Sequence, residues 1–374
     1  MGNLTEAERH RLREELDRAA IRAALLRYCR GVDRADETVL ASAYHPDAID
    51  AHGPFHGNAH EFAHWCVAEI PRQRLGLQHI TGNALIEFDG ENAEVARVES
   101  YYISTSRLRS EPGVLTLMAG RYLDRFERRD TGWRIGHRTV TKDWAISDRL
   151  APDRAVSWTG FPQGSFGRTD PLCSAETWIS PSRKDGPAMP ARTGEFDDTE
   201  LTALRTALAR AEITDAVYRF CRGVDRGDEP IIRSVFHPDA AVAIGDFART
   251  GPGFAAELAG NLPSEWLGAH HFVGNVFIEF DGDTARCESY FTVGFRLRSD
   301  PAIAGQIGGR FLDRFERRGD GPWLIARRTA VKDWTLSDRI EAGVSPSVRG
   351  YPEGRMDRQD LLFAPSTWAS AAER

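Results

Sequence analysis

The sequence predicts an α+β fold that is built twice in one chain, each time as three helices packed on a curved antiparallel sheet. Short motifs recur once in the same order, such as residues 45–48 at 237–240 and residues 142–144 at 332–334. Their spacing is about half of the 374-residue chain and far exceeds the period of a solenoid repeat. In each copy, helix-type periodicity precedes strand-type runs that are separated by turns. The chain is therefore a tandem duplication of a whole domain.

Three helices are expected at the start of the first copy. Residues 5–33 carry apolar side chains at the spacing of one helix face, and Thr5 with Glu8 is typical of a capping box. A short second helix is expected over 37–44, because Pro46 disfavours its continuation. A third is expected over 59–69. The helices thus precede all the predicted strands.

After Pro71 the sequence changes to four strand-type runs, at 77–88, 93–106, 114–127 and 133–143. The turn Asp89-Gly90 lies between the first two runs and is a strong hairpin signal, which Asp281-Gly282 repeats in the second copy. Strands joined in this way form an antiparallel meander. Helices laid on one face of a curved sheet enclose a pocket, and we expect the functional site there.

A linker is predicted between the two copies. Residues 181–199 are rich in Pro, Gly, Asp and Lys and lack periodicity. They separate a first domain at 1–180 from a second domain at 200–374. The tail of each domain belongs to the repeat, because residues 160–162 recur as 350–352.

Composition excludes several classes of protein. The formal net charge is −7 and both signs are interspersed, so we expect no nucleic-acid or membrane partner. No apolar run is long enough to span a membrane, and the N-terminus is too charged for a secretory signal. The five cysteines form no CxxC pair, which indicates reduced thiols rather than disulfides or a zinc site. We therefore expect a cytoplasmic protein.

The first candidate site is an acid and a histidine that both copies keep. Asp33 ends the first helix and His79 lies on the first long strand; their counterparts are Asp225 and His271. A single Asp at a helix end usually caps a turn, and a single His in a strand usually belongs to the core. Because both survive a duplication that changed most positions, we expect a dyad in which the carboxylate orients the imidazole for proton transfer.

The polar residues around this dyad differ between the copies. Tyr28, Asp50 and His52 of the first copy become Phe220, Val242 and Ile244 in the second. The ring is kept in both copies, but the hydroxyl is present only in Tyr28. Packing alone does not require this hydroxyl, so Tyr28 is a second catalytic candidate. The second pocket should be more apolar and chemically poorer.

Arg138 and its counterpart Arg328 lie on the last strand of each copy. A cross-strand salt bridge explains them simply, and the alternative is a clamp for an anionic substrate group. Four histidines recur every fourth residue from His52 to His64, but Gly53-Pro54 interrupts any helix there, so no metal is expected. No nucleotide-binding, nucleophile-elbow or zincin motif is present, which leaves cofactor-independent proton transfer as the natural enzyme class.

Several motifs together resemble the SnoaL-like branch of the nuclear transport factor 2-like superfamily. They lie at residues 28–34, 45–48, 79–83, 97–101, 120–124 and 142–144. The resemblance implies two cone-shaped barrels and cofactor-free lyases such as scytalone dehydratase, bile-acid dehydratase and hexachlorocyclohexane dehydrochlorinase. It assigns the dyad to positions matching His79 and Asp33, with Tyr28 nearby and Arg138 on the late strand. Many relatives carry a further histidine where this chain has Ser106. Because family members often form dimers of single domains and the linker is short, we expect a pseudo-twofold dimer of the two copies within one chain, with a higher oligomer left open.

We therefore expect a lyase or isomerase that acts on a hydrophobic, oxygenated polycyclic substrate such as a steroid, terpenoid or polyketide. His79 removes a proton next to a carbonyl, Asp33 orients it, and Tyr28 hydrogen-bonds the enolate or the departing hydroxyl. The expected substrate-binding residues are Arg138, Asp50, His52, Ser106 and Phe220. Three alternatives stay open: a non-catalytic binding or scaffolding protein, a polyketide-type cyclase, and the small subunit of a ring-hydroxylating oxygenase.

Overall fold

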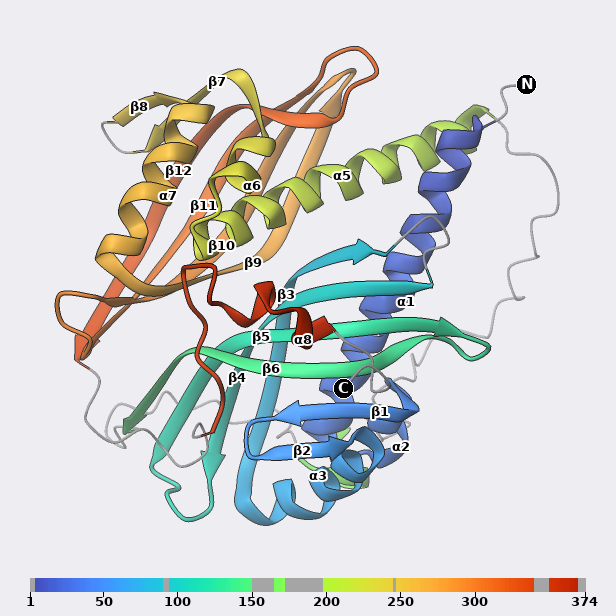
Figure 1. Cartoon of the computed structure of the whole chain (residues 1–374), viewed down its shortest axis with the longest axis vertical. Helices are drawn as coiled ribbons and strands as arrows, with labels where there is room; N and C mark the ends of the chain where they lie inside the picture. The colour runs from blue at the N-terminus through green and yellow to red at the C-terminus, as the bar shows by residue number, and fades with distance from the viewer. Residues whose placement is uncertain are drawn as a thin grey trace, which may run out of the picture.

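The two copies fold alike, and the predicted α+β architecture is confirmed (Figure 1). The computed structural model describes residues 4–89, 94–149, 165–171, 198–244, 247–339 and 350–368. The first copy contains α1 (Glu6–Arg34), α2 (Glu37–Ala41), β1 (Tyr44–His52), β2 (Phe55–Asn58), α3 (Ala59–Gln73), β3 (Arg74–Phe88), β4 (Val95–Leu108), β5 (Val114–Arg129) and β6 (Gly132–Arg149). The second contains α5 (Asp198–Arg226), α6 (Glu229–Ser234), β7 (Phe236–Ile244), β8 (Phe247–Thr250), α7 (Gly251–Glu265), β9 (Trp266–Asp281), β10 (Thr284–Leu297), β11 (Ile303–Arg317) and β12 (Trp323–Arg339). The short elements η2 (Gly167–Thr169), η5 (Leu361–Phe363) and α8 (Pro365–Trp368) lie in the tails.

Each copy has one six-stranded sheet, ordered β2-β1-β6-β5-β4-β3 and β8-β7-β12-β11-β10-β9. The antiparallel meander β3 to β6 follows the prediction. Two strands before α3 are missing from the prediction, and β1 pairs with β6 in parallel. Residues 44–58 show no clear period of two, so only pairing with the distant β6 identifies β1 as a strand. The helices lie on the inner face of the sheet and cover it.

Local sequence signals determine the helix boundaries in part. The capping box is present, because Glu8 N–H donates to Thr5 Oγ1 at 3.1 Å and Thr5 N–H donates to Glu8 Oε2 at 2.8 Å. Helix α3 continues through Pro71 to Gln73, four residues beyond the expected end. Pro71 therefore does not end the helix. Its carbonyl accepts a hydrogen bond from the Arg109 side chain at 3.0 Å.

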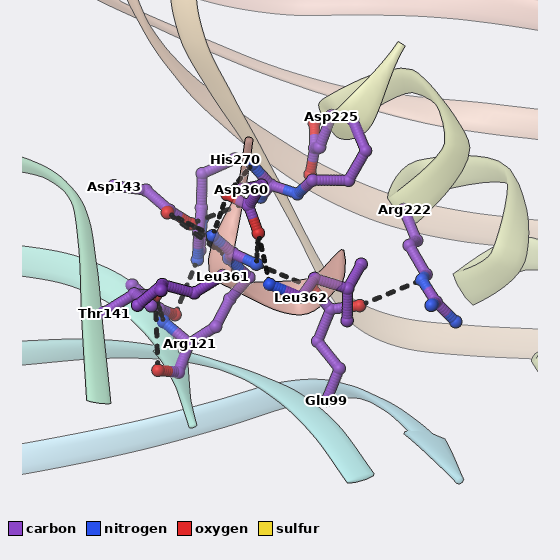
Figure 2. A network of polar contacts seen from close by, with 12 residues as sticks. Glu99, Arg121, Thr141, Asp143, Arg222, Asp225, His270, Asp360, Leu361 and Leu362 are labelled. Carbon is purple, nitrogen blue, oxygen red and sulfur yellow. Dashed lines mark hydrogen bonds and ion pairs between the residues drawn. The ribbon is translucent and has the colours of Figure 1, made fainter. Parts of the chain in front are cut away.

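The two copies contact each other through unlike surfaces. Asn83 on β3 donates to the His271 carbonyl at 2.8 Å and accepts from Val273 N–H at 2.7 Å. Its counterpart Asn275 is exposed. The tail of the second copy lies on the sheet of the first, where Asp360 binds Arg121 at 2.7 Å (Figure 2). The contacts are therefore not those of the twofold pair that we expected, because each copy contributes a different face.

The long helices α1 and α5 approach each other at their N-terminal ends (Figure 1). Arg205 of α5 binds Glu8 of α1 at 2.5 Å, and Arg11 of α1 binds Glu212 of α5. Most of the predicted linker lies outside the described residues, and its last two residues begin α5. Among the described helices, none is both long and apolar enough to cross a membrane.

Candidate active site

The end of helix α1 brings Asp33 to His79 on strand β3. Their closest atoms, His79 Nδ1 and Asp33 Oδ1, lie 2.6 Å apart, and His79 N–H donates to Asp33 Oδ2 at 2.8 Å. Because a carboxylate accepts hydrogen bonds, we assign the imidazole proton to Nδ1. Both carboxylate oxygens hold the same residue, which fixes the ring and leaves Nε2 available to a ligand.

A glycine explains where Asp33 emerges. Gly31 lies in the last turn of α1 against Leu40 of α2, and a Cβ at Gly31 would lie 2.5 Å from the Leu40 nitrogen. No larger residue allows α2 to pack this closely against the end of α1. The second copy keeps the arrangement, with Gly223 against Ile232. The helix end that carries the acid is thus fixed by close packing.

His79 faces a cavity of about 310 Å³ between the helices and the sheet of the first copy. Its apolar wall includes Phe62, Trp65, Leu77 and Met118. Its polar lining includes His52, Arg74, His79, Ser104, Ser106 and Thr116. An apolar cavity with a few converging polar groups is typical of a small-molecule site.

A second histidine on the cavity wall also has an acid behind it. His52 Nδ1 lies 3.5 Å from Asp50 Oδ1 and 3.4 Å from the Tyr28 hydroxyl. Asp50 is fully buried, Tyr44 donates to its Oδ2, and Oδ1 has no hydrogen-bond partner in the described part of the chain. Burial raises the pKa of Tyr28 well above its usual value, so its hydroxyl stays a donor. Nδ1 of His52 therefore has a partner in either state of the ring. Tyr28 donates to Nδ1 when it carries no proton, and Asp50 accepts from it when it does.

Three predicted site residues, Tyr28, Asp50 and Arg138, do not line the cavity. Arg138 is fully buried and binds its cross-strand partner Asp124 through two hydrogen bonds of 2.7 and 2.6 Å. Its guanidinium lies between the rings of Tyr28 and Tyr122, at 4.0 and 4.1 Å from their centroids. The predicted substrate clamp is thus wrong for Arg138, because every approach to it is filled by protein. The cross-strand salt bridge describes it correctly.

Ser106 does line the cavity, and it accepts a hydrogen bond from Arg74 Nη1 at 2.7 Å. Burial lowers the pKa of Arg74, and no carboxylate of the described residues lies within ion-pair distance of it. Within the part of the chain that the structure describes, Arg74 thus faces the cavity as a cation without a counter-ion. Arg74 is not among the predicted site residues; the signal in the sequence was its replacement by Trp266 in the second copy.

The second copy keeps the dyad. His271 Nδ1 lies 2.5 Å from Asp225 Oδ1, and its N–H donates to Oδ2 at 2.8 Å. Burial opposes ionisation of Asp225, but His271 and Arg226 together outweigh burial and lower the pKa of this carboxyl. Four buried tyrosines become phenylalanines: Tyr28, Tyr44, Tyr102 and Tyr122 correspond to Phe220, Phe236, Phe291 and Phe311.

The polar end of the cavity is also replaced in the second copy. Trp266 and Phe295 stand at the positions of Arg74 and Ser106, and their rings stack at 4.5 Å. The Phe295 ring packs directly on Gly305, the counterpart of Thr116. Phe220, which we expected at a second substrate site, lies in the core against Arg328. Rings therefore occupy the place of the polar groups of the first cavity.

Tyr351 in the tail of the second copy completes the wall of the first cavity. Its ring centroid lies 5.6 Å from that of His52, and the ring packs on Gly53. A Cβ at Gly53, whose φ is +61°, would lie 2.9 Å from this ring. The Pro352 carbonyl accepts from Lys142 N–H at 2.8 Å, which holds the tail along β6. The repeat of the tail motif is visible in the sequence, but the copy that this tail contacts is not.

The described residues contain no group of three or more His, Cys, Asp or Glu side chains that could hold a metal ion. Of the evenly spaced histidines, His64 instead approaches Glu37 at 3.4 Å, and His52 belongs to the cavity.

Comparison with solved structures gives single-domain relatives, each covering about one copy. A type 2 hexachlorocyclohexane dehydrochlorinase is 23% identical, over 39% of this chain and 99% of that chain, with a TM-score of 0.36. The type 3 enzyme from Novosphingobium barchaimii is 24% identical, over 38% and 99%, with a TM-score of 0.35. A protein described as a putative scytalone dehydratase from Novosphingobium aromaticivorans is 21% identical, over 42% and 97%, with a TM-score of 0.32. No protein with a curated description matches the sequence.

The SnoaL-like domain family matches the chain twice, at residues 13–139 and 205–329, which together exceed half of its length. Each match begins in the long first helix of a copy and ends on its last strand. With its duplicated helices, meander sheets and dyads, this chain belongs to the SnoaL-like domain family, of which it carries two copies.

Proposed function

We propose that the first copy is a cofactor-independent lyase or isomerase that removes a proton from a hydrophobic, oxygenated substrate. The observation that carries this proposal is the His79–Asp33 pair on the wall of the cavity. The carboxylate orients the imidazole and stabilises it when it gains a proton. Nε2 then acts as a general base toward a C–H group next to a carbonyl.

His52 supplies the second proton-transfer group in this proposal. It lines the same cavity, and Asp50 and Tyr28 provide for both of its protonation states. In an elimination, His79 takes the proton from carbon and the electron pair forms the carbon–carbon double bond. His52 gives a proton to the departing oxygen, so that water leaves. Tyr28 then acts as a positioning residue for His52 rather than as a direct contact of the substrate.

The cavity supports a substrate with apolar rings and an acidic oxygen group at one end. Steroids, terpenoids and polyketides contain such molecules. On β4, Ser104 pairs with His79, and Ser106 lies two residues further, or about 7 Å along the strand. An oxygen group bound by Arg74 and Ser106 would therefore be displaced along β4 from the carbon that faces His79.

Replacing Arg74 with methionine should raise KM for a carboxylate-bearing substrate about 10- to 100-fold, because it removes a hydrogen bond to a charged group. The same substitution should leave KM for the matching methyl ester nearly unchanged. Arg72→Met is the control, since Arg72 is exposed and, among the described residues, pairs with Glu69 alone. Equal effects on the acid and the ester would contradict the assignment of Arg74.

Hydrogen exchange with solvent tests the function itself. In deuterium oxide, the protein should accelerate exchange next to the carbonyl of a 2-decalone carboxylic acid, as followed by proton NMR. Binding of this probe should be measured in parallel by calorimetry. Tight binding without accelerated exchange would instead favour a non-catalytic binding protein.

For the second copy we propose a structural role. Its aromatic filling leaves the Asp225–His271 pair as an inherited hydrogen bond, while its tail supplies Tyr351 to the first cavity. The four described cysteines are free, which supports the cytoplasmic location that we also propose.

A further inference from the structure

At five matched positions, one copy has a tyrosine where the other has a phenylalanine. The first copy has the tyrosine at four of them, where Tyr28, Tyr44, Tyr102 and Tyr122 correspond to Phe220, Phe236, Phe291 and Phe311. The fifth position is reversed, because Phe161 in the tail of the first copy corresponds to Tyr351 in the tail of the second. Tyr351, however, lies on the wall of the first cavity. All five tyrosines therefore lie in or directly behind the wall of the first cavity.

The tail of the second copy takes the place of β1 along β6. Thr139 is the last residue of β6 that pairs with β1. Three residues further, Lys142 N–H donates to the Pro352 carbonyl at 2.8 Å, and Gly354 N–H donates to the Lys142 carbonyl at 2.9 Å. Like β1, the tail runs parallel to β6. The tail therefore joins the sheet of the first copy from the residue that follows Tyr351.

A buried ion pair fixes the tail at a second point (Figure 2). Asp360 binds Arg121 of the first sheet at 2.7 Å and accepts from Arg355 N–H at 2.7 Å. Arg121 also binds Asp143 of β6 at 3.1 Å. Both Asp360 and Arg121 are buried. The segment that follows Tyr351 is thus held on the first sheet at both of its ends, which fixes the position of this residue.

Two glycines place the Tyr351 ring beside His52. Gly350 and Gly53 have φ angles of +85° and +61°, which residues with a side chain rarely adopt. A Cβ at Gly53 would lie 2.9 Å from Cζ of Tyr351, the ring carbon that bears the hydroxyl. The ring stands edge-on to His52, with 5.6 Å between the two centroids. The hydroxyl end of the Tyr351 ring therefore lies at the turn that follows His52.

The Tyr351 hydroxyl is a hydrogen-bond donor near Arg74. In the part of the chain that the structure describes, this hydroxyl has no hydrogen-bond partner. Burial raises the pKa of Tyr351, and the charge of Arg74 opposes that shift. Burial lowers the pKa of Arg74, and Tyr351 opposes that shift in turn. Such a mutual effect requires the two groups to lie near each other. At neutral pH the hydroxyl keeps its proton and can donate it to a ligand oxygen.

Arg74 and Tyr351 together suit an anionic group. Arg74 Nη1 donates to Ser106 Oγ at 2.7 Å, and a guanidinium has further N–H groups besides this one. A carboxylate has about four acceptor positions on its two oxygens, so it can accept from a guanidinium and a hydroxyl at the same time. Trp266 stands in place of Arg74 in the second copy, and Phe161 stands in place of Tyr351 in the first tail. The two donors therefore occur together at the first cavity.

We propose that Tyr351 binds the substrate in the first cavity, where its hydroxyl donates to the same carboxylate that Arg74 binds. This proposal rests on the proposed function, from which it takes the acidic group of the substrate. The two copies then share one substrate site, because the His79–Asp33 dyad belongs to the first copy and one donor for the substrate belongs to the second. The second copy contributes to specificity through its tail, without any use of its own dyad.

Calorimetry on the full-length chain tests this proposal with the 2-decalone carboxylic acid and its methyl ester. Tyr351→Phe should weaken binding of the acid about 10-fold, because it removes one hydrogen bond to a charged group. Binding of the ester should change little. The ring and its packing on Gly53 remain, and the first tail already carries Phe161 at this position. Tyr290→Phe is the control, since Tyr290 is an exposed tyrosine that does not line the cavity.

The double variant Arg74→Met/Tyr351→Phe shows whether both groups bind one carboxylate. Two donors that act on the same group are coupled, so their effects on affinity should not be independent. The loss of affinity for the acid in the double variant should be smaller than the product of the two single losses, by about threefold or more. A loss equal to that product would place the two groups on different parts of the substrate and contradict the shared carboxylate.

Binding and turnover fail separately in this experiment, because calorimetry requires no reaction. If the wild-type protein binds the acid without accelerating deuterium exchange, the proposed function is wrong and the role of Tyr351 in binding stands. If Tyr351→Phe binds the acid as tightly as the wild-type protein, the role of Tyr351 is wrong at any rate of exchange. Equal losses for the acid and the ester would also overturn it, because they would indicate a change in packing.

Discussion

Replacing His79 with alanine should lower turnover by at least about 100-fold, because a positioned general base contributes about 10²- to 10⁴-fold. Asp33→Asn should have an effect of similar size, since it removes the acceptor that orients Nδ1 and stabilises the protonated ring. Both losses should appear in kcat while the circular dichroism spectrum is unchanged. The measurement is the rate of deuterium exchange and of product formation on the same probe.

The second copy provides the matched control. His271→Ala and Asp225→Asn change the same pair of groups at equally short distances, but in a copy where Trp266 and Phe295 replace the polar residues Arg74 and Ser106. They should leave turnover nearly unchanged. If His271→Ala proved as damaging as His79→Ala, the assignment of catalysis to the first copy would be wrong.

His52→Gln separates the two histidines. Without a proton donor for the leaving group, the enzyme should still exchange the acidic hydrogen but should form little product. Loss of both activities together would indicate that His52 positions the substrate rather than donating a proton.

Replacing Arg138 with leucine should destabilise the first copy by about 3–5 kcal/mol, because it leaves Asp124 as a buried charge without a partner. Burial already raises the pKa of Asp124, and only Arg138 offsets this cost. Urea denaturation followed by tryptophan fluorescence measures the loss.

The double variant Arg138→Leu/Asp124→Leu should lose much less stability, since it removes both buried charges. A single variant of normal stability with weakened substrate binding would instead restore the substrate clamp that the sequence suggested.

Local patterns predicted most of the elements. Helix α1 has a capping box and a long apolar stripe, and strands β3 to β6 are separated by strong turn signals, so these elements follow from residues close in sequence. Strand β1 does not, because its partner β6 lies about 90 residues away. Because both copies keep Asp33 and His79, the duplication also predicted that these residues pair, although they lie on different elements.

The cavity lining was harder to predict. Arg74 lies where α3 gives way to β3, and nothing in its neighbours indicates that its side chain turns inward. Tyr28 and Asp50 were correctly identified as residues that only the first copy has, but they lie one layer behind the cavity and act on His52. A sequence pattern indicates which side chains point toward the same side of an element. It does not indicate whether a side chain reaches the cavity or stays in the layer behind it.

By itself, the sequence determined that the chain carries one domain twice, which helices and meander strands build it, and which acid and histidine both copies keep. Repeats, periodicity and turn residues encode these features within a few neighbouring positions. Only the tertiary structure decided that the copies pack through unlike faces and that Tyr351 of one copy closes the cavity of the other. Such features arise from contacts between residues far apart in the chain, so identical motifs in the two copies acquire different surroundings.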